Sequence, residues 1–174
     1  TLDFCRTCGL VTAETTREII SVARGLFKAQ GFYSAYKDIE KAREAIRDGN
    51  FENAVTRSIA CLESVMCVCH EKLGQSLPSK KQVSDLWKST RSILRFDELD
   101  PSEATLKLMN ALSGVVNHLG GLRNKLGDAH GKGIFSPDVS ETIAELAINT
   151  ASTLSTAISR RFNQIKGGSS NERN

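Results

Sequence analysis

Two residues whose types suit acid–base and phosphate chemistry, Arg123 and His130, lie seven positions apart in a glycine-rich segment. Arginine is a permanent cation, and histidine titrates near neutral pH. On a continuous helix seven residues make two turns, which puts both side chains on one face about 10 Å apart along the axis. A helix that ends at Gly127 would instead let the chain carry His130 back toward Arg123. Either geometry places the permanent cation of Arg123 beside His130, a side chain that can take up and release a proton.

That combination suits RNA cleavage without a metal ion, in which the ribose 2′-OH attacks the neighbouring phosphate. Histidine can move protons to or from the reacting oxygens, and arginine can stabilise the charge that gathers on the phosphoryl oxygens. From the spacing alone, a solvated basic patch is the simpler interpretation of Arg123 and His130.

Several neighbouring residues have two interpretations each. Asp128 could orient His130 or cap a loop, and Lys125 and Lys132 could attract RNA or be ordinary surface lysines. Glu63 could face the Arg–His segment or be a surface carboxylate near Arg57 or Arg91. His118 lies off the face of His130, and Trp87 is expected in the core rather than stacked on a base. His70 is expected at a helix end.

The cysteines predict thiols in a reducing compartment, because their number is odd and no basic-then-apolar leader opens the chain. They are Cys5, Cys8, Cys61, Cys67 and Cys69. Cys5 and Cys8 have the spacing of half a zinc site, but the nearest further ligands lie on a helix that we expect to be buried. We therefore expect a cytoplasmic protein with no metal and no cofactor; a zinc-dependent regulator built on Cys5 and Cys8 is the competing interpretation.

The composition is that of a globular domain. The 174 residues carry a net charge of +3, with 40% hydrophobic and 25% charged residues, which excludes wholesale disorder. The longest uncharged run, residues 108–122, is too short and too polar to span a bilayer, so no membrane association is expected. Thr1 in place of methionine suggests a piece of something larger.

The elements that must position these residues are helices. Three prolines separate long proline-free stretches, and no strand pattern occurs. Apolar residues at helical spacing predict helices over 14–30, 34–47, about 50–73, 80–95, 108–126 and 143–162. We expect an all-α bundle of four or five main helices joined by short loops.

The helix over 108–126 has apolar residues on more than one face. Its seam of leucines and Val115 should face the core, whereas Val116, with Gly114, Gly120 and Gly121 nearby, should contact a second copy of the chain. The residues expected in the core are Leu62, Met66, Leu112, Val115, Leu119, Leu154 and Ile158.

The string Leu122-Arg123-Asn124-Lys125-Leu126-Gly127-Asp128-Ala129-His130-Gly131-Lys132-Gly133 resembles the signature of the abortive-infection C-terminal (Abi-C) family. That family belongs to the HEPN superfamily, whose motif is an arginine, a polar residue, a short spacer and a histidine. The resemblance extends to residues 54–65, 77–87 and 143–158. It indicates an HEPN-like domain over 34–165, an N-terminal helical segment over 1–33 and a disordered tail over 166–174.

The resemblance implies specific roles. Arg123, Asn124 and His130 would be the motif residues, and two copies would face each other in a homodimer to form one metal-independent RNA-cleaving cleft. Such proteins commonly act as toxins or in phage defence, with an antitoxin or an upstream effector domain as possible partners. The alternative is a non-catalytic helical module that dimerises or binds nucleotide within a larger defence protein.

Overall fold

The ends of the second and third helices follow from residues with special backbone geometry. Gly49 and Gly74 have φ of +70° and +64°, the left-handed region that favours glycine. Asn50 caps the next helix, since its side-chain oxygen accepts a hydrogen bond from the Asn53 N–H at 3.2 Å. These positions separate α2 (Tyr33–Arg47) from α3 (Phe51–Lys72) and end α3, as the sequence predicts.

The computed structural model describes the backbone of residues 2–80, 82–127 and 139–171, and the side chains of residues 14, 16–80, 82–125 and 139–167. Within these ranges the chain is all-α, which confirms the predicted fold class. The remaining helices are α1 (Leu2–Gln30), α4 (Val83–Ile93), the short 3₁₀ helix η1 (Phe96–Glu98), α5 (Glu103–Gly127) and α6 (Glu141–Asn171).

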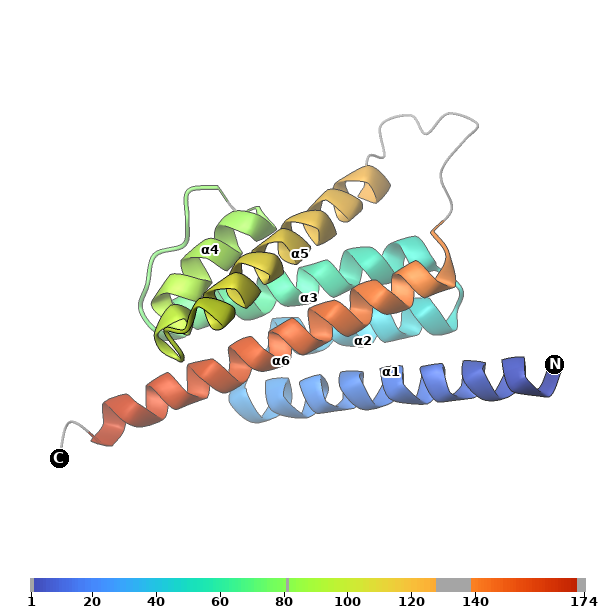
Figure 1. The fold of residues 1–174 in the computed structure, drawn as a ribbon, viewed down its shortest axis with the longest axis horizontal. Helices are drawn as coiled ribbons and strands as arrows, with labels where there is room; N and C mark the ends of the chain where they lie inside the picture. The colour runs from blue at the N-terminus through green and yellow to red at the C-terminus, as the bar shows by residue number, and fades with distance from the viewer. Residues whose placement is uncertain (1, 81, 128–138, 172–174) are drawn as a thin grey trace.

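Helix α3 lies in the middle of the bundle and packs against α2, α4, α5 and α6. Figure 1 shows α4 and α5 along one edge, α1 along the opposite edge and α6 crossing the bundle between them. Helix α1 packs against α2 and α6 and contributes Ile20, Ala23 and Phe27 to the core. The described residues therefore form six α-helices rather than four or five, because the N-terminal segment is part of the same bundle.

Five of the seven residues predicted for the core are buried: Leu62, Met66, Leu119, Leu154 and Ile158. The prediction is wrong for Val115, which is 38% exposed, and Leu112 is only half-buried. Val116 is fully buried instead. Val116 and the equally buried Gly120 cannot form the contact with a second copy that the sequence predicts for them.

The reason is that α4 and α3 decide which face of α5 is buried. The Trp87 indole N–H of α4 donates to the Ser113 hydroxyl of α5 at 2.8 Å, and Trp87 is in the core as predicted. The other end of α4 is held by α6, because the Arg161 Nε donates to the carbonyl of Leu94 at 2.8 Å. With α4 anchored this way, α5 turns Val116 and Leu119 inward and leaves Leu108 and Val115 exposed.

Two helices are longer than predicted. Helix α1 begins at Leu2 rather than near residue 14, and α6 continues to Asn171, past residue 166 where the tail was expected to begin. Each added helical residue gains a backbone hydrogen bond once a helix exists, so a helix can continue without burying side chains. No helix in the described part of the chain is long and apolar enough to cross a membrane.

Candidate active site

Arg123 lies near the C-terminal end of α5, on the face of the helix that meets α3. It follows Val116 by seven residues, so the two share an angular position, and the burial of Val116 shows that this position faces the bundle. The guanidinium therefore reaches toward α3. Its side chain keeps 27% of its surface exposed, which leaves it accessible from solvent.

The partner of Arg123 is Glu63 of α3. The Arg123 Nη1 donates to the Glu63 Oε2 at 2.6 Å, and the glutamate side chain is 19% exposed. The competing sequence interpretation is wrong, because Arg57 pairs with Asp38 and Arg91 pairs with Asp97. The ion pair thus links the motif arginine on α5 to α3, the central helix of the bundle.

The second carboxylate oxygen of this pair is buried. Glu63 Oε1 has no hydrogen-bond partner among the described residues. A carboxylate removed from water depends on its cationic partner, since an unpaired charge in such a place is costly. The Glu63–Arg123 pair is therefore an inward-facing contact between two helices and differs from an exposed surface ion pair.

The next two motif positions on α5 face solvent. Asn124 and Lys125 are exposed, and His118 is exposed on a different face of the helix from Arg123. Asp128, His130 and Lys132 lie outside the described residues, so their predicted roles stay predictions. The structure brings Arg123 and Glu63 together, and the sequence signal for Glu63 was its place beside the apolar seam of its helix.

Two of the described thiols, Cys61 and Cys69, are poorly suited to bind a metal, because burial keeps them protonated. Burial, followed by the nearby charge of Asp38, raises the pKa of Cys61 far above its usual range. Burial, followed by the charge of Cys67, raises the pKa of Cys69 to about 12. Among the described side chains no three His, Cys, Asp or Glu residues group as a metal site, and the side chains of Cys5 and Cys8 are not among them.

His70 lies in the last turn of α3, at the helix end that the sequence predicts, and is fully buried. Its Nδ1 lies 3.0 Å from the carbonyl oxygen of Ser76. This contact ties the end of α3 to the segment before α4 and does not involve the motif.

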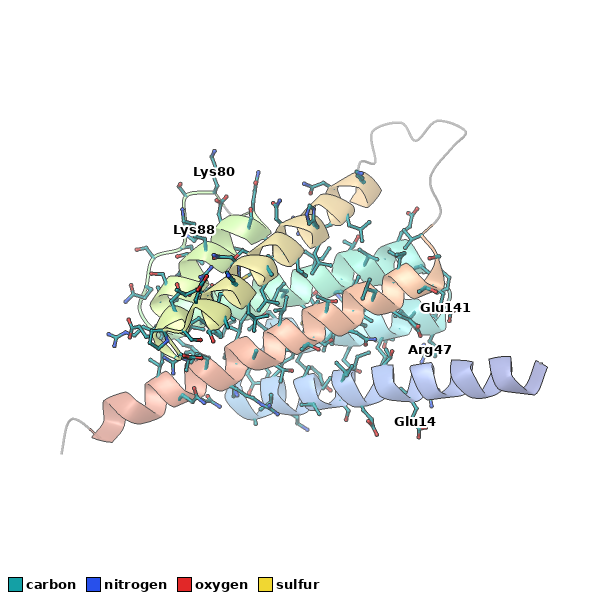
Figure 2. All side chains as sticks on the ribbon, viewed as in Figure 1. Glu14, Arg47, Lys80, Lys88 and Glu141 are labelled. Atoms are coloured by element: carbon teal, nitrogen blue, oxygen red, sulfur yellow. The ribbon has the colours of Figure 1, made fainter. Side chains whose placement is uncertain are left out.

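Two hollows in the surface are lined by other residues. One, of about 490 Å³, lies between α1, α2 and α6, and Figure 2 shows Arg47 beside Glu141 there. The other, of about 380 Å³, lies along α4 with Lys80 and Lys88 on it (Figure 2). The first hollow mixes arginine and glutamate side chains, so its charge does not select one class of ligand.

Comparison with known proteins identifies the class to which this all-α bundle belongs. A family model described as Abi_C, an HEPN-like domain, matches residues 34–160. The chain belongs to the Abi_C family, because the match covers well over half of its length and ends within the predicted HEPN-like region. No curated protein and no solved structure matches the chain.

Proposed function

We propose that the chain is a metal-independent endoribonuclease of the HEPN type that acts in abortive infection or a related phage-defence system. The observation that carries the proposal is the part-exposed Arg123 guanidinium, held by Glu63 at the end of α5 in an Arg-Asn…His string. Membership in the Abi_C family supports this reading, since HEPN-like domains are often ribonucleases.

The chemistry uses the residues in distinct roles. The ribose 2′-OH attacks the adjacent phosphorus while His130 acts as general acid or base. Arg123 binds the scissile phosphate and stabilises the negative charge that grows on its oxygens in the transition state. The Asn124 amide holds His130 or the phosphate. The bond from phosphorus to the 5′ oxygen breaks, which leaves a 2′,3′-cyclic phosphate and a 5′-hydroxyl.

Two copies of the chain complete the cleft in this proposal. Leu108 and Val115 form an exposed stripe on α5, 56% and 38% exposed, and Arg123 lies about two turns further along the same helix. Exposed apolar groups in one region mark a contact surface. A two-fold axis near the C-terminal end of α5, beyond Val115, would bring two Arg123 side chains together.

The test is cleavage of a defined single-stranded RNA by the purified full chain in EDTA. Wild type should produce cyclic phosphate ends, and His130→Ala should lose ~10²–10⁴-fold in rate. His118→Ala is the matched control, since it removes an exposed histidine of α5 that lies on a different face of the helix from Arg123. Cleavage by His130→Ala at the wild-type rate, or activity only with added Mg²⁺, would favour the non-catalytic module instead.

A further inference from the structure

We propose that Glu63 is a positioning residue that sets the orientation of the Arg123 guanidinium toward the scissile phosphate. This inference rests on the proposed function of Arg123 and names a third residue for the same site. Its basis is the 2.6 Å contact between Glu63 Oε2 and Arg123 Nη1 across the packed helices α3 and α5.

The contact with Glu63 uses only one of the nitrogen atoms of the planar Arg123 guanidinium. Arginine carries five N–H donors in a rigid arrangement, and phosphate is best bound by two of them at once. Glu63 takes the Nη1 end, and no other described residue accepts a hydrogen bond from this guanidinium. The Nε and Nη2 donors form a parallel pair that has no acceptor among the described residues, and in this proposal it binds two phosphate oxygens. A carboxylate that holds one end therefore determines where this pair points.

The pair also fixes a side chain that would otherwise sample many rotamers. Both side chains are mostly shielded, at 27% and 19% exposure, and Glu63 Oε1 is buried with no hydrogen-bond partner among the described residues. The ion pair and the enclosed carboxylate therefore restrain both side chains. Since a displacement of about 1 Å in a reacting group can cost about 10²-fold in rate, this restraint matters for catalysis.

A second carboxylate in the bundle provides a matched control. Asp38 of α2 is 18% exposed and pairs with Arg57 of α3, with Oδ1 3.7 Å from Nη1. It resembles Glu63 in burial and in joining two helices, but its arginine is not part of the motif. Asp38→Asn therefore reports the purely structural cost of removing a half-buried charge.

The first readout separates binding from turnover. Glu63→Gln removes a negative charge, so RNA should bind as tightly as to wild type or more tightly, while kcat falls ~10²-fold. Asp38→Asn should leave kcat within about twofold at a similar change in melting temperature. A role confined to stability would lower activity in both variants in step with their melting temperatures, and that result would overturn the proposal.

The second readout does not depend on cleavage. The ¹⁵N–¹H signal of the Arg123 Nε should be resolved in wild type, shift on adding a 2′-O-methyl oligonucleotide, and merge with the mobile arginines in Glu63→Gln. An Arg123 signal that is unchanged in Glu63→Gln would refute positioning. If wild type cleaves no RNA while the signal behaves as expected, the ribonuclease proposal fails and Glu63 orients an arginine that only binds phosphate.

Discussion

Gly120 of α5 packs directly against Val83 of α4, so closely that a Cβ at position 120 would lie 2.5 Å from Val83 Cγ1. Two non-bonded carbon atoms do not approach to that distance. Valine has one strongly preferred χ1 rotamer in a helix, so a change of rotamer that relieved the clash would cost energy. Arg123 follows Gly120 by three residues, close to one helical turn. The absence of a side chain at position 120 therefore allows α4 and α5 to pack closely, one helical turn before Arg123.

Gly120→Ala should destabilise the fold by about 1–3 kcal/mol, the usual cost of forcing extra atoms into a packed contact. Gly121→Ala is the control, because nothing lies within 4 Å of its Cβ position. It should stabilise the chain by up to about 1 kcal/mol through helix propensity. Adding Val83→Ala should recover part of the loss. Urea unfolding measures all three, and equal effects of the two glycine changes would contradict the close contact.

The orientation of α5 predicts a large difference between two leucines of the same helix. Leu119 is buried and Leu108 is 56% exposed. Leu119→Ala should cost ~2–5 kcal/mol, whereas Leu108→Ala should change the free energy of unfolding by less than about 0.5 kcal/mol. If thermal or urea unfolding ranked the two variants in the opposite order, the assigned phase of α5 would be wrong.

The exposed stripe of α5 predicts a self-association that one charge can break. Sedimentation of wild type at tens of micromolar should show a dimer, and Val115→Lys should shift it to monomer because a lysine in an apolar contact is costly. Val22→Lys is the control, since Val22 of α1 is comparably exposed outside the stripe. A monomeric wild type would count strongly against the composite cleft.

Substitutions of Arg123 should damage both binding and cleavage. Arg123→Ala removes the phosphate contact and leaves Glu63 unpaired, so a loss of stability of about 1–3 kcal/mol should accompany the loss of activity. Arg123→Lys should preserve the ion pair but only partly restore cleavage, because a lysine lacks the planar fork. Rates measured in EDTA beside melting temperatures separate the effects. Full activity of Arg123→Lys would argue against bidentate phosphate binding.

The raised pKa values of the buried thiols predict that the folded chain loses stability at high pH. The pKa of Cys69 is raised to about 12 by burial, so the folded chain keeps this proton above pH 9 while the unfolded chain loses it. The stability that Cys69 contributes is complete below about pH 9 and falls as the pH rises toward 12. Cys69→Ala should flatten that decline in urea unfolding between pH 8 and 10.5, and an unchanged slope would contradict the shift.

Much of the fold around the candidate site can be predicted from the chain alone. The family match agrees with the resemblance carried by the string from Leu122 to Gly133, and the described backbone confirms the helices around it. Periodicity identified Leu62, Met66, Leu154 and Ile158 as core because their helices have one apolar face each. A single apolar stripe leaves a helix only one way to pack in water.

The sequence by itself determined the all-α class, the helix order and the Arg-Asn…His string, because helical periodicity, turn residues and motif spacing are local properties. Tertiary structure decided the rotation of α5 and the partner of Arg123. Helix α5 has two apolar stripes, so its own pattern leaves Val115 and Val116 both eligible for the core. Packing against α4 and α3 selects Val116, and Arg123, two turns later on the same face, consequently meets Glu63, sixty residues away in the chain.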